Sequence, residues 1–182
     1  MTGLDAVDRI EVVSADLTRQ QVDAIVNPAN PQLANAGGAA GAISRAAGPE
    51  LQRACDELIA ESGVLRTGQA VVTDAFQLPC GKVIHVVGPV YGQHGGEEAE
   101  LLAAAHRNAI SLAADSGLAS VAFPAISCGI FGYPVEEAAP IAISTTAQTL
   151  GESGDRVELV RFCFIGESER AVFAQALEDL RG

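Results

Sequence analysis

The chain has 182 residues, of which 48% are hydrophobic and 19% charged; this composition suits one globular domain with a sizeable core and excludes a disordered chain. Its formal net charge of −12 at pH 7 argues against direct binding to nucleic acid or to an anionic membrane, because like charges repel. An anionic ligand would therefore have to be held locally, against the field of the whole protein.

Strands and helices alternate along the chain. Apolar or β-branched runs predict strands at residues 9–14, 23–26, 69–73, 83–87, 121–123 and 157–164. Helical spacing predicts helices at residues 39–47, 49–62, 97–115, 135–150 and 168–180. Pro49 suits a first helical turn, Gly117 a helix stop and Ser168 an N-cap. This alternation predicts an α/β fold in which helices cover both faces of a largely parallel sheet.

The start of the chain and its cysteines indicate the compartment. Residues 1–8 contain two acidic side chains and no apolar core, so we expect no secretory leader, and no apolar run reaches the roughly 18 residues of a membrane span. Cys55, Cys80, Cys128 and Cys163 follow neither a CxxC nor a zinc-type spacing and are typical of free thiols in a reducing cytoplasm. We expect a cytoplasmic protein, a monomer, with no metal and no cofactor.

Ligands of such sheets bind beyond the carboxyl ends of the strands, so the loops that follow strands matter most. The first such loop, residues 27–44, has no charged residue and leads into the helix expected near Ala39. Its glycines let the backbone approach a ligand, the helix would aim free N–H groups at it, and two asparagines add side-chain amides. These residues are Asn27, Asn30, Gly37, Gly38 and Gly41.

A second neutral loop follows the strand at 121–123. In PAISCGIFGY, Gly129 and Gly132 bracket Ile130 and Phe131, whose backbone amides could form a nest for an anion. Two uncharged, glycine-bearing loops at strand ends suit a diphosphate held by amides and helix dipoles, without lysine or arginine.

Asp16 ends the first predicted strand. Its carboxylate could accept a hydrogen bond from an exocyclic amine, or it could simply cap a turn. A competing interpretation starts from residues 36–41, which are one residue short of the dinucleotide-binding fingerprint and would indicate a nicotinamide-dependent oxidoreductase. The fingerprint, however, forms a tight turn directly after a first strand, whereas these glycines lie well beyond the second. A P-loop is excluded, since the chain has no Gly-Lys-Ser/Thr.

Together these elements resemble the macro domain family. The motifs are Ala15-Asp16-Leu17-Thr18, Asn27-Pro28-Ala29-Asn30, Gly37-Gly38-Ala39, Gly88-Pro89-Val90 and the segment 124–134. The resemblance covers almost the whole chain and implies a single domain over residues 1–182. It implies a three-layer α/β/α fold with a mixed, largely parallel sheet. The implied partner is ADP-ribose, free or attached to a protein.

The resemblance also implies the ligand contacts. Asp16 would accept from adenine N6 and Leu17 would lie at the ring, while Phe164 or Ile165 would stack on it. Asn30 would hold the distal ribose. The remaining contacts would run along the diphosphate and the distal ribose from the two loops: Gly37, Gly38, Ala39, Ala40, Ser127, Cys128, Gly129, Ile130 and Phe131.

The first loop departs from the members that hydrolyse ADP-ribosyl esters. Ala40 stands where those members carry an aspartate, and Ser44 replaces a histidine. A general base must be a titratable group within reach of the reacting atoms, so this loop favours a binding module over a hydrolase. The alternative remains a hydrolase that removes ADP-ribose from acidic side chains or deacetylates O-acetyl-ADP-ribose, with ordered water and Asn30 as the catalytic residue. Pro28, where alanine is usual, removes one backbone donor.

Other side chains carry weaker signals. His85 is expected to be a satisfied histidine of the sheet, His94 to lie in a surface loop and His106 to face solvent from a long helix. Cys128, close to a helix start, could have a depressed pKa and act as a nucleophile, although a small space-filling residue is the simpler interpretation. Tyr133 could pack over the ribose or wedge its loop against the fold.

Overall fold

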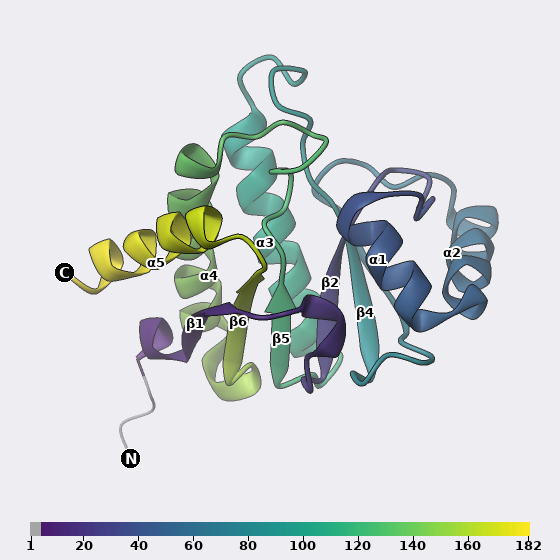
Figure 1. Cartoon of the computed structure of the whole chain (residues 1–182), viewed down its shortest axis with the longest axis horizontal. Coiled ribbons are helices and arrows are strands. Elements are labelled where there is room, and N and C mark those ends of the chain that lie inside the picture. The colour runs from purple at the N-terminus through teal and green to yellow at the C-terminus, as the bar shows by residue number, and fades with distance from the viewer. Residues whose placement is uncertain (1–4) are drawn as a thin grey trace.

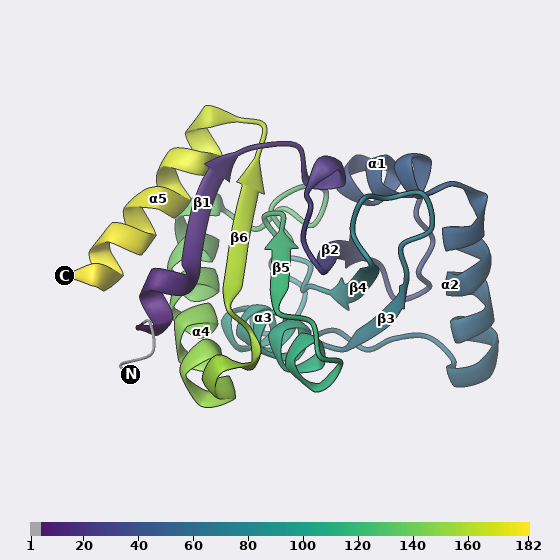
Figure 2. The ribbon, with the colours of Figure 1, turned by 90° about the horizontal axis from the view of Figure 1, so that it is seen from below.

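The computed structural model describes residues 5–182. The prediction that residues 1–8 form no secretory leader falls partly on residues 1–4, which lie outside the described residues. Six strands form one sheet in the order β1-β6-β5-β2-β4-β3 (Figure 2). All neighbours are parallel except β3 and β4, which are antiparallel at one edge. The strands are β1 Ile10–Ser14, β2 Ala24–Ala29, β3 Ala70–Asp74, β4 Lys82–Val87, β5 Ser120–Phe123 and β6 Leu159–Phe164.

Five helices cover the sheet in two layers (Figure 1). One layer is formed by α1 and α2, which pack over β2 and β3, and the other by α3, α4 and α5. The predicted three-layer α/β fold with a mixed, largely parallel sheet is therefore confirmed. The helices are α1 Gly38–Ala47, α2 Pro49–Ser62, α3 Glu98–Asp115, α4 Val135–Ser153 and α5 Glu167–Arg181, with short 3-10 turns η1 Ala6–Arg9, η2 Leu17–Arg19 and η3 Gly154–Arg156.

Burial explains why the central strands read as continuous apolar runs. Nearly every residue of β2 and β4 is buried, since helices cover both of their faces. The largest core lies between the sheet and α3, α4 and α5, and two smaller ones lie on the side of α1 and α2. Within residues 5–182, no helix is long and apolar enough to cross a membrane.

Most predicted boundaries differ from the structure by one to three residues, and two of the differences concern the elements around the cavity. The second strand continues to Ala29 and does not end at Val26, because its last residues stay paired with β4. The last helix begins at Glu167 with Gly166 as its N-cap residue, so the prediction that Ser168 caps it is wrong. Gly117 does follow the end of α3 with φ +71°, a conformation that favours glycine.

The topology places four loops at one edge of the sheet. Because β1, β6, β5 and β2 are parallel, the segments after Ser14, Phe164, Phe123 and Ala29 all emerge on the same side. These include both charge-free loops and the turn that contains Asp16.

Candidate functional site

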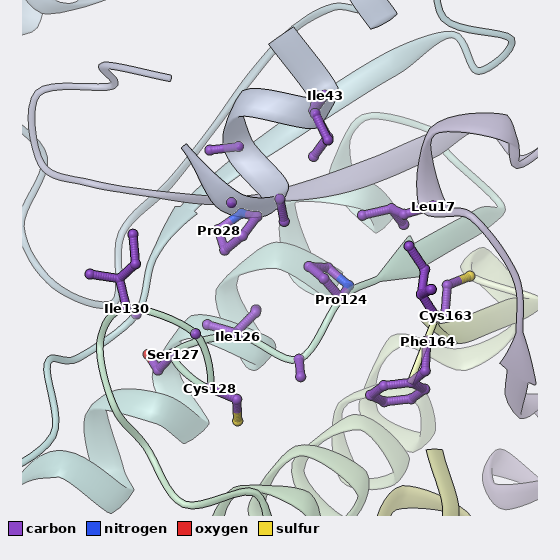
Figure 3. A pocket seen from close by; sticks show the side chains of 18 of the residues that line it. Leu17, Pro28, Ile43, Pro124, Ile126, Ser127, Cys128, Ile130, Cys163 and Phe164 are labelled. Carbon is purple, nitrogen blue, oxygen red and sulfur yellow. The ribbon is translucent and has the colours of Figure 1, made fainter. Parts of the chain in front are cut away.

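A cavity of about 480 Å³ opens at this edge of the sheet, over the carboxyl ends of β1, β6, β5 and β2. Leu17, Cys163 and Phe164 gather at one end of it, and Pro28 and Ile130 lie toward the other (Figure 3). All fourteen residues that the family resemblance implied as ligand contacts lie on its wall: Asp16, Leu17, Asn30, Gly37, Gly38, Ala39, Ala40, Ser127, Cys128, Gly129, Ile130, Phe131, Phe164 and Ile165. Their contact with a ligand stays a prediction.

The cavity exists because β2 and β5 separate. They pair only at Ala24 with Val121 and Ile25 with Ala122, after which β2 continues beside β4 alone. Pro28 lies in this continuation and lines the cavity. A proline is tolerated there because no strand lies on the β5 side at that level to accept an N–H.

The first loop presents the free end of a helix to the cavity. Gly37 caps α1 without a side-chain hydrogen bond, and the amides of Gly38, Ala39 and Ala40 have no acceptor among residues 5–182. Unpaired first-turn amides and the positive end of the helix dipole attract an anion. Gly38 has φ +58°, so its turn favours glycine.

The second loop offers a similar set of donors from the opposite side. The amides of Gly129, Ile130 and Phe131 donate to no protein group in the described part of the chain. The loop is closed by Tyr133 N, which donates to Ser127 O at 2.9 Å. The two loops therefore face each other across the cavity with free N–H groups on both sides and without a cationic side chain.

Ser127 and Gly88 fit together tightly beneath the second loop. Ser127 has φ +66°, an uncommon conformation for a residue with a side chain, and its buried Oγ has no hydrogen-bond partner within residues 5–182. A Cβ on Gly88 would lie 2.2 Å from that Oγ. Gly88 also lines the cavity. The Gly-Pro pair at 88–89 was part of the sequence resemblance, but no role was predicted for it.

Asp16 serves as a cap and as part of the wall. Its Oδ1 accepts hydrogen bonds from Thr18 N at 2.9 Å and Thr18 Oγ1 at 2.7 Å, which caps η2. These bonds, together with the charge of Arg19, hold the pKa of the carboxyl below its usual value. Asp16 is thus ionised at neutral pH and able to accept from a ligand amine at the rim.

Comparison with known proteins identifies the family of this fold and cavity. Residues 26–142 match the family model of the Macro domain. The chain belongs to the macro domain family. The macro domain-containing protein CT2219 of Chlorobaculum tepidum is 48% identical over 92% of this chain and 95% of its own length. The O-acetyl-ADP-ribose deacetylase of Klebsiella pneumoniae is 46% identical over 92% of this chain and 95% of its own length.

A solved macro domain structure confirms the similarity in three dimensions. A mutant of the Oceanobacillus iheyensis macrodomain, with ADPR, superimposes with a TM-score of 0.89 and 39% sequence identity. The match covers 94% of this chain and 92% of the other. The same macrodomain is also known with ADP.

Asn27 and Asn30 in the first loop of this macro domain are held by different partners. Asn30 lines the cavity, but its side-chain amide is engaged with Ala34, whose N donates to Oδ1 at 2.9 Å and whose O accepts from Nδ2 at 3.0 Å. Asn27 is buried away from the cavity, and its Nδ2 lies 2.9 Å from both Asn35 Oδ1 and His85 Nδ1. Asn27 therefore supports the loop and does not present an amide to a ligand.

His85 is the centre of the polar network that holds this loop. Burial lowers its pKa to about 4, so the ring is neutral near pH 7. Since Asn27 Nδ2 donates to Nδ1, the proton sits on Nε2 and is donated to Thr73 Oγ1 at 2.9 Å. The expectation of a satisfied sheet histidine is confirmed.

Gln52 on α2 extends the support of the loop. Its Oε1 accepts from Asn35 N and its Nε2 donates to Leu33 O, both at 3.0 Å. No local pattern indicates this role of Gln52, because its partners lie on another element.

Two further histidines lie away from the cavity. His106 is fully buried, stacks on Phe123 with ring centroids 5.5 Å apart, and has Nδ1 2.9 Å from Leu102 O, so the expectation of solvent exposure is wrong. His94 lies in the expected loop, where Val90 N donates to its Nε2 at 3.2 Å.

Cys128 is not an activated thiol. Burial, assisted by the charges of Glu169 and Glu136, raises its pKa to about 12, so the thiol stays protonated at neutral pH. The expected depression of the pKa of Cys128 is therefore wrong, and a small residue that fills space stays the simpler interpretation. All four cysteines are free thiols.

Tyr133 wedges the second loop and does not line the cavity. Its ring meets Tyr91 edge to face at 4.9 Å. Tyr91 N donates to Phe131 O at 2.8 Å, and Tyr91 Oη donates to Glu137 Oε2 at 2.8 Å. The segment after β4 thus braces the second loop from outside.

The remaining wall is mostly apolar, with one exception that the sequence did not suggest. Among the described residues, the charged ones on the wall are Asp16 and Glu169. Glu169 lies in the first turn of α5. Residues added to the wall by the structure include Thr18, Pro28, Ile43, Gly88, Pro124, Ile126, Cys163 and Glu169.

Proposed function

We propose that this macro domain binds ADP-ribose in the cavity, either free or as mono-ADP-ribose attached to a protein. The observation that carries the proposal is the pair of uncharged loops whose free amides face each other across one cavity. A diphosphate between them would receive hydrogen bonds from both sides and the dipole of α1.

The rest of the cavity suits the rest of the ligand. Asp16 would accept from the adenine amine next to Leu17, and the distal ribose would lie near Asn30 and the start of α1. Phe164 and Ile165 both stay candidates for the adenine contact. Phe164 is 3% exposed and packs on Phe173, whereas Ile165 is 88% exposed at the rim. A volume of about 480 Å³ is in the ordinary range for small-molecule sites.

The relatives support this ligand. One solved relative carries ADPR and another form of it carries ADP. At 39% and 41% identity these proteins share the fold over 94% of this chain.

Binding should be measured by calorimetric titration. We expect ADP-ribose to bind in the micromolar range or tighter, about −8 kcal/mol, and NAD to bind more weakly, since its nicotinamide must fit against the first loop. Equal binding of NAD would contradict the proposed pocket and would revive the oxidoreductase hypothesis.

A second candidate function is hydrolysis, favoured by the relative named O-acetyl-ADP-ribose deacetylase. Against it, Ala40 and Ser44 leave the first loop without a carboxylate or imidazole, and Asn30 is engaged with Ala34. A general base for water is therefore lacking near the distal ribose, which favours a binding module.

An assay with two substrates distinguishes the candidates. The protein is incubated with O-acetyl-ADP-ribose and with a protein ADP-ribosylated on glutamate, and release is followed over many turnovers. We expect none beyond the background rate. Sustained turnover that is lost in Asn30→Ala, while ADP-ribose still binds that variant, would establish the hydrolase.

We further propose that the protein works as a monomer in the cytoplasm, on ADP-ribose or ADP-ribosylated proteins and not on nucleic acid. The net charge of −12 supports the last point. Sedimentation tests whether the protein is a monomer, and a filter-binding assay with labelled DNA and RNA tests whether it binds nucleic acid.

A further inference from the structure

Glu169 is a charged residue in the wall for which the proposed ligand contacts have no role. It lies in the first turn of α5, three residues after Gly166, where β6 has just ended. Glu169 is exposed to solvent, and its charge would repel an anionic ligand unless that ligand offers the carboxylate a hydrogen-bond donor.

The carboxylate of Glu169 is free to accept such a donor. Asp16 already accepts two hydrogen bonds from Thr18, and Glu167 pairs with Arg170. Glu169, by contrast, makes no hydrogen bond and no ion pair within residues 5–182. Of the two carboxylates that the described residues place on the wall, that of Glu169 is the one whose two oxygens are both free to accept a hydrogen bond from a ligand.

Two observations place this carboxylate near the end of β6 and near the second loop. A Cβ on Gly166, at the end of β6, would lie 3.4 Å from Glu169 Oε2, so the side chain turns back toward the strand end. On its other side Glu169 is close enough to Cys128 for its charge to help raise the pKa of that thiol. Phe164 and Cys128 line the cavity together with Glu169, and the first two are labelled in Figure 3.

The ligand group that belongs between an adenine and a diphosphate is the adenosine ribose. Its hydroxyls are hydrogen-bond donors, and the other donor of the adenosine, the exocyclic amine, is expected at Asp16. A carboxylate that accepts from a ribose 2′-hydroxyl also repels a phosphate at that position.

We propose that Glu169 is a specificity-determining residue that accepts a hydrogen bond from the adenosine ribose and rejects nucleotides phosphorylated on its 2′-oxygen. The inference rests on the proposed function, because it takes its ligand from there. It assigns to this cavity a preference for ligands derived from NAD-type nucleotides over their 2′-phosphorylated counterparts.

The first test measures rejection of the phosphate. ADP-ribose and 2′-phospho-ADP-ribose are titrated calorimetrically into wild type, Glu169→Gln and Glu167→Gln. Glu167→Gln is the matched control, since it removes the same charge from the same helical turn but lies off the wall. We expect wild type to prefer ADP-ribose at least tenfold, Glu169→Gln to lose about tenfold of that preference, and the control to keep it.

The second test measures the hydrogen bond. ADP and 2′-deoxy-ADP are titrated into wild type and Glu169→Ala. We expect wild type to bind ADP about fivefold better, within the range of one exposed charge-assisted hydrogen bond, and Glu169→Ala to bind both equally.

The outcomes separate this inference from the proposed function. If wild type does not bind ADP-ribose, the proposed function is wrong. If wild type binds it but Glu169→Gln keeps the full preference, or if Glu169→Ala still distinguishes ADP from 2′-deoxy-ADP, the role of Glu169 is wrong and the proposed function stands. Suppose that Glu169→Gln binds both ADP-ribose and 2′-phospho-ADP-ribose more tightly than wild type, with the ratio of the two affinities unchanged. Glu169 would then only repel anionic ligands, and its role in specificity would be wrong.

Discussion

The two ends of the cavity use opposite chemistry. The end between the first turn of α1 and the second loop offers backbone N–H groups and no charge, whereas the end beside β1 and β6 offers the carboxylates of Asp16 and Glu169. A protein with a net charge of −12 can hold an anion if its acids face the donors of the ligand and its amides face the phosphates. The difference also gives the ligand one direction of binding.

Call the end of the cavity between the two loops the amide end, and the end that holds Asp16 and Glu169 the carboxylate end. Acid should weaken the amide end first. The folded pKa of His85 and of His106 is about 4, below the value near 6.5 of an unfolded chain, so the unfolded state takes up protons first as pH falls. Stability is therefore fully present above about pH 6.5 and is lost as pH falls toward 4, by up to about 3 kcal/mol per histidine.

Urea unfolding at pH 7, 5.5 and 4.5 measures this loss. Protonation of His85 also removes its acceptor for Asn27, so the first loop should loosen, while Asp16 stays charged because its pKa is lowered. His106→Leu should show about half of the wild-type loss. An unchanged pH dependence in that variant would contradict the assignment.

Gly88→Ala should disrupt the amide end by sterics alone. The new Cβ would lie 2.2 Å from Ser127 Oγ and 2.6 Å from Ile126 Cγ2, so the second loop must move. We expect ADP-ribose affinity to fall about a hundredfold, the upper range of an overpacking penalty. Calorimetry and thermal unfolding measure it. Gly151→Ala, which adds a methyl in open space on α4, is the control and should bind as wild type.

Asp16→Ala should weaken the carboxylate end by about 1.5–3 kcal/mol, the scale of a charge-assisted hydrogen bond. The variant also loses the cap on Thr18, so Asp16→Asn, whose Oδ1 can still accept from Thr18 N, is measured beside it. If Asp16→Ala binds ADP-ribose as tightly as wild type, Asp16 is a cap and not a ligand contact.

Tyr91→Phe should have the smallest effect. It removes the exposed hydrogen bond to Glu137 but keeps the ring contact with Tyr133 and the backbone bond to Phe131. We expect less than a threefold change in ADP-ribose affinity. A larger loss would show that the amide end depends on the brace from outside the cavity.

Local pattern was sufficient for most of the fold. Helical spacing and β-branched runs predicted the five α-helices and six strands of residues 5–182, though none of the three 3-10 helices, since these signals depend on neighbours within one element. Parallel strands then required that the two neutral loops and Asp16 emerge at one edge, and they do. Two wrong predictions had different causes. The Ser168 cap failed on a local boundary, because α5 begins at Glu167 with Gly166 in the cap position, whereas His106 was expected to face solvent although α3 turns it onto Phe123 of another element.

The amino-acid sequence was therefore enough to establish the family, the order of the elements and the charge-free character of the loops, because each is written in consecutive residues. Three features depended on the folded chain. The gap between β2 and β5, the fit of Gly88 under Ser127, and the free carboxylate of Glu169 beside the end of β6 each join segments far apart in sequence. Packing decides such features, since a side chain's role follows from what lies against it and not from its neighbours along the chain.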